Sequence, residues 1–103
     1  MKRIKNRKYI LKNVTDEFLK KFNELTNNKV YIIYKVIRSF KKNFPEAKYK
    51  IEFLNDEYNT IYFIIDKKTF IQEKFKKWRF KIQRNLIWKV KNLHIGFDYK
   101  QEA

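Results

Sequence analysis

The segment 67–91 holds ten Lys or Arg side chains and one acid, Glu73, so a quarter of the chain carries +9 of the formal net charge of +15. Four of these basic residues recur at steps of three and four, the spacing of one helix face: Lys74, Lys77, Lys81 and Arg84. Ammonium and guanidinium groups in such a row suit a phosphate backbone, because each neutralised phosphate releases counterions. The segment therefore predicts contact with a nucleic acid.

Two other segments are basic. Residues 1–8 carry +5, and residues 29–44 carry +5 without an acid, whereas 9–28, 45–66 and 92–103 carry 0, −3 and −1. The chain uses 21 Lys against 5 Arg and is rich in Asn, Ile, Phe and Tyr, which is typical of an AT-rich genome. Such a bias should scatter charge evenly. The positive charge is instead concentrated in three segments. This concentration favours binding of a polyanion over a merely solvated basic surface.

The predicted nucleic-acid contacts lie on two helix faces and the N-terminal arm: Lys35, Arg38, Lys42, Lys74, Lys77, Lys81, Arg84, Arg3, Lys5 and Arg7. Tyr31 and Trp88 are the candidates for stacking on bases or sugars. We expect DNA to be slightly favoured over structured RNA, without evident sequence specificity, because Arg, the usual reader of guanine, is scarce. The alternative partner is an acidic protein surface, which would make the chain a small adaptor or inhibitor.

A catalytic hypothesis rests on three acids and a histidine. Glu52, Asp66 and Asp98 share strand parity and would bind a divalent metal if their strands were neighbours. His94 would then serve as a base, giving a metal-dependent nuclease. No spacing motif supports this site, and exposed sheet faces carry acids routinely. We therefore expect a non-enzymatic protein without metal or cofactor.

Composition restricts the class of protein further. A hydrophobic content of 44% and an aromatic content of 18% exclude a disordered basic tail. No apolar run is long enough for a membrane span, and no apolar signal region follows the basic N-terminus. We therefore expect a protein of the cytoplasm or an organellar matrix. The lack of cysteine excludes disulfides and zinc fingers.

Three helices are expected to position the basic residues. Thr15 is a good N-cap for the first. Segment 29–44 reads as a helix ending at Pro45, although residues 29–37 also have strand character. The third helix begins at a capping box formed by Thr69 and Gln72. Residues 85–91 fit either a helix or a strand. The apolar stripes of the second and third helices are Val30, Ile33, Ile37, Phe40 and Phe44, then Ile71, Phe75, Trp78, Ile82 and Leu86.

Alternating residues predict a first strand at 9–13, a hairpin of 49–53 with 61–65, and a last strand at 93–99 with a bulge at Gly96. The order β-α-α-β-β-α-β predicts an α+β two-layer sandwich, an antiparallel sheet with helices on one face. Ferredoxin-like, KH-like and winged helix-turn-helix arrangements are the alternatives. We expect a basic arm at 1–8, a single domain at 9–99 and a tail at 100–103, with Glu52, Tyr62, Asp66, His94 and Asp98 on the open sheet face.

Overall fold

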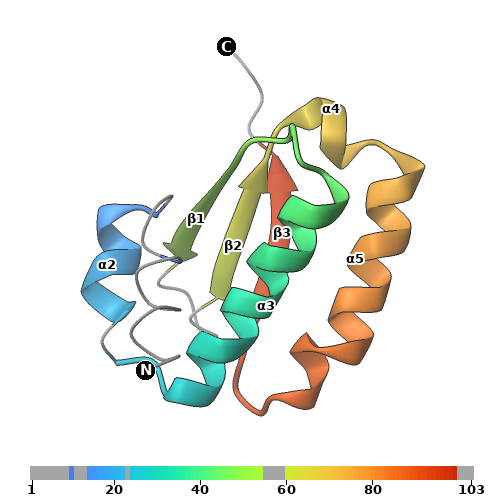
Figure 1. The fold of residues 1–103 in the computed structure, drawn as a ribbon. Coiled ribbons are helices and arrows are strands. Elements are labelled where there is room, and N and C mark those ends of the chain that lie inside the picture. Colours follow the sequence, from blue (N-terminus) through green and yellow to red (C-terminus); the bar gives the residue numbers. More distant parts are fainter. Residues whose placement is uncertain (1–9, 11–13, 23, 55–59, 100–103) are drawn as a thin grey trace.

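The computed structural model describes residues 10, 14–22, 24–54 and 60–99 of the 103-residue chain. They form a small α+β fold (Figure 1). The elements are α2 (Asp16–Phe22), α3 (Asn27–Asn43), β1 (Tyr49–Leu54), β2 (Thr60–Ile65), α4 (Lys67–Phe70), α5 (Glu73–Asn85), the 3-10 helix η2 (Ile87–Lys89) and β3 (Ile95–Tyr99). No helix in these ranges is both long enough and apolar enough to cross a membrane.

The helix predicted over 29–44 is confirmed as α3. Thr26 caps it by accepting a hydrogen bond from the Lys29 amide at 3.3 Å. Its predicted apolar stripe is buried from Val30 to Phe44, and the backbone ends its helical path just before Pro45. Helical period therefore prevailed over the β-branched composition of its first half, because a continuous buried stripe contributes more than local propensity. Thr15 caps α2 as expected, accepting from the Phe18 amide at 3.4 Å.

The hairpin is also confirmed, and it forms the body of the sheet. β1 and β2 pair antiparallel from Tyr49 with Ile65 to Leu54 with Thr60. Ile51 and Phe63 are fully buried on the inner face. The hairpin strands are therefore core strands. The turn at 55–59 lies outside the described residues.

The expectation of an all-antiparallel sheet is wrong, because β3 pairs parallel with β2. The strand order is β1-β2-β3. α5 is about 20 Å long at 1.5 Å per residue, which is close to the length of a six-residue strand. One such helix returns the chain from the end of β2 to its start, so the next strand must run in the same direction as β2. Gly96 pairs regularly with Tyr62 and forms no bulge.

The single helix predicted from the capping box at Thr69 onward is replaced by the three short helices α4, α5 and η2. Asp66, not Thr69, caps the first of these, accepting from the Thr69 amide at 3.1 Å and the Thr69 hydroxyl at 2.8 Å. Thr69 is consequently buried, and Gln72 starts α5 without a side-chain cap bond. The capping box was wrong because Asp66 lies nearer the end of β2 and is the stronger cap. Ile71, expected in the buried stripe, lies at the break and is exposed.

The expected first strand at 9–13 falls largely outside the described residues. Ile10 is helical and fully buried, and Val14 makes an isolated parallel bridge with Ile51. The ferredoxin-like and KH-like orders both begin with a strand there, and the described part of the chain supplies none. The predicted arm and tail, at 1–8 and 100–103, also lie outside the described residues.

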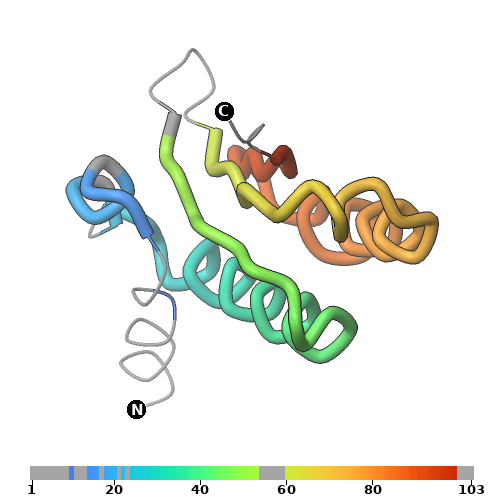
Figure 2. Tube along the Cα trace, turned by 90° about the horizontal axis from the view of Figure 1, so that it is seen from above, coloured from blue at the N-terminus to red at the C-terminus, as the bar shows by residue number. Residues whose placement is uncertain are grey.

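The core lies between one face of the sheet and the helices α3 and α5, which run side by side on that face (Figure 1; Figure 2). α2 lies at the β1 edge in both views and contacts that strand. Aromatic rings join the layers: the Trp78 ring centroid lies 5.5 Å from those of Phe40 on α3 and Phe97 on β3. Such ring pairs contribute about 0.5–1.5 kcal/mol each beyond burial, so they hold α5 in position against α3 and the sheet.

Candidate functional site

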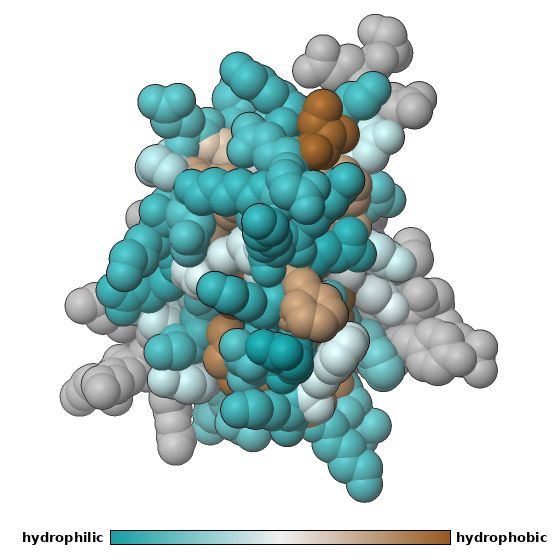
Figure 3. Space-filling view, turned by 90° about the vertical axis from the view of Figure 1, so that its right-hand side faces the viewer, coloured by the Kyte–Doolittle hydropathy of each residue, from teal (hydrophilic) through white to brown (hydrophobic). Residues whose placement is uncertain are grey.

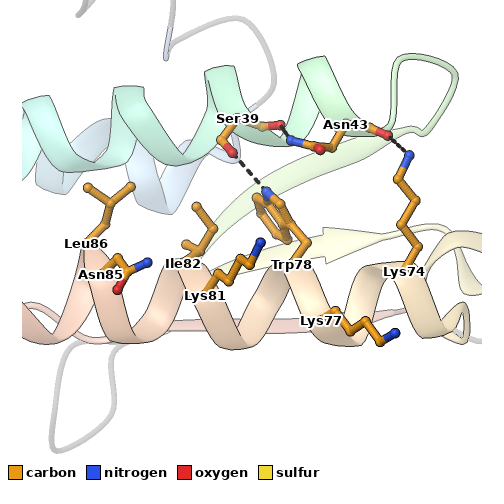
Figure 4. A pocket seen from close by; sticks show the side chains of 9 residues that line it. All are labelled: Ser39, Asn43, Lys74, Lys77, Trp78, Lys81, Ile82, Asn85 and Leu86. Atoms are coloured by element: carbon orange, nitrogen blue, oxygen red, sulfur yellow. Dashed lines mark hydrogen bonds between the residues drawn. The ribbon is translucent and has the colours of Figure 1, made fainter.

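The lysine groove is the hollow between α3 and α5, with a volume of about 450 Å³. Its lining is Ser39, Asn43, Lys74, Lys77, Trp78, Lys81, Ile82, Asn85 and Leu86 (Figure 4). Three of the predicted contact lysines therefore come together here. The sequence placed these lysines on one helix face, separate from the apolar stripe. In the structure the row of lysines adjoins the apolar stripe. Lys74 and Ile82 are each four residues from Trp78, so all three lie on the same side of α5.

Hydrogen bonds hold the two walls of the lysine groove together. The Trp78 indole Nε1 donates to Ser39 Oγ at 2.9 Å, and the Lys74 ammonium donates to the Asn43 carbonyl at 2.7 Å (Figure 4). Asn43 Nδ2 in turn donates to the Ser39 carbonyl at 2.8 Å. Lys74 thus caps the negative end of α3, and its Nζ also lies 5.0 Å from the Phe44 ring centroid. Lys77 and Lys81 make no such contact among the described residues, which leaves their charges available to a ligand.

The basic residues predicted on α3 are all exposed and lie outside the lysine groove. Two of them contact tyrosines of the same helix. The Lys35 ammonium lies 5.7 Å from the Tyr31 ring centroid, and Arg38 Nη1 donates to Tyr34 Oη at 3.1 Å. Lys42 is in the last turn, where its charge is favourable to the helix dipole. α3 therefore presents cations that are partly ordered by aromatic rings.

The outward side of α5 is hydrophilic with isolated apolar spots (Figure 3). Phe80 is 58% exposed, and the Arg84 guanidinium stacks over its ring at 5.4 Å. α3 and α5 together carry eleven Lys or Arg and one acid, Glu73. The helical layer therefore holds most of the positive charge of the described chain. Arg3, Lys5 and Arg7 lie outside the described residues.

Trp88 does not join the lysine groove. It lines a second hollow of about 440 Å³ on the β3 side of α5, which we call the indole hollow. The indole hollow is lined by Thr60, Arg79, Gln83, Ile87, Trp88, Leu93, His94, Ile95 and Gly96. Arg79 and Gln83 were missed from the sequence. Their spacing of four residues, on the side of α5 away from Lys74 and Lys81, is the signal that could have found them.

The acids proposed for a metal site are not brought together. Glu52 and Asp98 do lie on the outer sheet face as predicted, but Glu52 pairs with Tyr62 and Asp98 with Ile64, so they sit on non-adjacent strands at different levels. Asp66 caps α4 beyond the end of β2, and His94 is exposed before β3. The part of the chain that the structure describes contains no group of three or more potential metal ligands.

The Asp66 carboxylate has a structural role. Burial by itself would raise the pKa of its carboxyl group. Hydrogen bonds from the Thr69 hydroxyl, the Thr69 amide and the Lys48 amide outweigh that effect and hold the pKa of Asp66 below its usual value. The carboxylate thus joins the start of β1 to the start of the crossover that carries α5.

No protein-family model, curated protein or solved structure matches this chain.

Proposed function

We propose that this protein binds the phosphate backbone of a nucleic acid through the exposed sides of α3 and α5. The observation that carries the proposal is the concentration of eleven basic residues against one acid on two adjacent helices, with Lys77 and Lys81 beside the groove that separates them. A phosphate chain running along the lysine groove would neutralise these charges and release counterions. The opposite face of the sheet offers no comparable attraction, since Lys50 there is accompanied by Glu52 and Asp98.

The test is a salt titration of binding to duplex DNA, single-stranded DNA and structured RNA of equal length. The test variant is Lys77→Ala with Lys81→Ala. Its matched control is Lys50→Ala with Lys68→Ala, which removes the same charge from exposed positions outside the lysine groove. We expect the test variant to reduce the slope of log K against log salt by about 2, and the control to leave it nearly unchanged.

Two results would contradict the proposal. One is an equal loss in both double variants, which would show attraction by net charge without a site. The other is no salt-dependent binding to any of the three nucleic acids, combined with tight binding to an acidic protein. That second result would favour the adaptor alternative.

A further inference from the structure

The two tryptophans of the chain have opposite environments. Trp78 is 7% exposed, packed among four aromatic neighbours and hydrogen-bonded through its indole nitrogen. Trp88 is 69% exposed, the largest fraction among the exposed large hydrophobic residues of the described chain. Exposure of most of an indole forfeits stabilisation that its burial would give, and a planar ring open to solvent can serve as a platform for another ring.

Besides Trp88, the lining of the indole hollow combines apolar side chains with polar ones, among them Arg79 and Gln83, and it includes no acid. The Arg79 guanidinium lies over the rings of Phe70 and Phe97 at 5.8 and 5.7 Å, which orders it, and among the described residues it has no carboxylate partner. Gln83 Nε2 donates to the Ile95 carbonyl at 3.0 Å. That bond orients the Gln83 amide, which keeps one N–H and its oxygen for a ligand.

The backbone around the indole hollow is well determined by its own contacts. The Ile61 amide donates to the His94 carbonyl at 2.8 Å, joining the starts of β2 and β3. Asn92 has a φ of 62°, a left-handed conformation that Asn tolerates, and so turns the chain from η2 toward β3. A volume of about 440 Å³ lies within the range of roughly 300–1,000 Å³ that small-molecule sites occupy.

We infer that the indole hollow binds an unpaired nucleobase, which stacks on Trp88 with its polar edge toward Gln83 and Arg79. A nucleobase has apolar faces and a hydrogen-bonding edge, the combination that this lining complements. A base inside a duplex has both faces covered and its edge paired, so an indole at the surface can reach only an unpaired base. The inference rests on the proposed function and adds that the nucleic acid is single-stranded where it meets Trp88.

The experiment compares an oligothymidine with an abasic oligomer of the same number of phosphates. Binding is followed by anisotropy of a label on the oligomer, and the indole by its intrinsic emission, since Trp78 is buried. We expect oligothymidine to quench the emission of the wild-type protein and the abasic oligomer to bind without quenching. Trp88→Ala should weaken oligothymidine binding roughly 5- to 150-fold, the range for loss of one stacked base, and leave abasic binding unchanged.

Phe80→Ala is the matched control, because it removes a different exposed aromatic ring, on α5, that does not line the indole hollow. We expect it to keep the quenching. Equal affinity of Trp88→Ala and wild type for oligothymidine, or no preference of the wild type for oligothymidine over the abasic oligomer, would overturn the inference. Salt-dependent binding in that case would leave the proposed backbone contact standing. Loss of all oligomer binding in the wild type would instead overturn both.

Discussion

The two hollows beside α5 have nearly the same volume and opposite construction. The lysine groove contains the buried Trp78 at its base, and hydrogen bonds join its two walls, α3 and α5. Its lining therefore also stabilises the fold. The indole hollow has its tryptophan at the surface, and the Gln83 amide joins α5 to the Ile95 carbonyl of β3 beside it. The difference teaches that one residue type serves as core or as surface according to whether a second helix lies over it.

The largest contrast is expected in the stability of the tryptophan variants. Trp78→Ala should lower the free energy of unfolding by about 3–5 kcal/mol, because it leaves a cavity among packed rings and removes the partner of Ser39. Trp88→Ala should change it by no more than about 0.5 kcal/mol. Urea denaturation followed by circular dichroism measures both, and Trp78→Phe provides a milder variant should Trp78→Ala not fold. Similar losses in the two alanine variants would remove the distinction between the hollows.

A smaller effect on stability is expected at Asp66, which caps the start of the connection between β2 and β3 that carries α5. Because the pKa of Asp66 is lower in the folded than in the unfolded chain, its carboxylate stabilises the fold above about pH 5, and this contribution is lost as the pH falls through the folded value. Asp66→Asn should lower the free energy of unfolding by about 1 kcal/mol at pH 7, because a hydrogen bond to a charged acceptor contributes more than one to a neutral amide oxygen. The difference from wild type should shrink toward pH 2.

Asp98→Asn is the control for this measurement, since Asp98 is exposed and, among the described residues, accepts a hydrogen bond from its neighbour Tyr99 alone. We expect it to change the stability at pH 7 by no more than about 0.5 kcal/mol. A stability difference between wild type and Asp66→Asn that stays constant with pH would contradict the role of the charge at this cap.

The smallest effect separates two lysines of one groove. Lys74→Ala removes the bond to the Asn43 carbonyl at the end of α3 and should lower stability by about 0.3–1 kcal/mol. Lys81→Ala should leave stability unchanged while weakening nucleic-acid binding. Thermal unfolding and the salt titration, performed on both variants, give the two readouts. If Lys81→Ala proves as destabilising as Lys74→Ala, Lys81 is structural and should be removed from the proposed contacts.

Much of the fold could be predicted because the sequence patterns that indicate its helices and strands are local. The apolar stripe of α3, the Thr15 cap of α2 and the alternation of β1 and β2 each follow from residues close together in the chain. The direction of β3 was missed, although a strand followed by one crossing helix and another strand favours parallel pairing. The break at residues 71–72 was missed because Thr69 and Asp66 both suit a cap, and only their contacts distinguish them.

The candidate site was predicted only in part. Helical spacing identified Lys74, Lys77 and Lys81 as neighbours, and they line one groove. Trp88 was predicted as a stacking partner on the same surface, whereas the 3-10 turn after α5 carries Trp88 to the other side of the helix. Whether the predicted arm residues join either hollow stays a prediction.

By itself, the sequence determined the quantity and spacing of positive charge and the amphipathic period of each helix, because both depend on the order of residues along the chain. The apolar stripe also predicted that Trp78 is buried. Tertiary structure alone decided which lysine caps α3, and that Arg79 and Gln83 share a hollow with Trp88. These outcomes depend on packing between segments far apart in the sequence: Ser39 meets Trp78, and Asn43 meets Lys74, only once α3 and α5 lie together on the sheet.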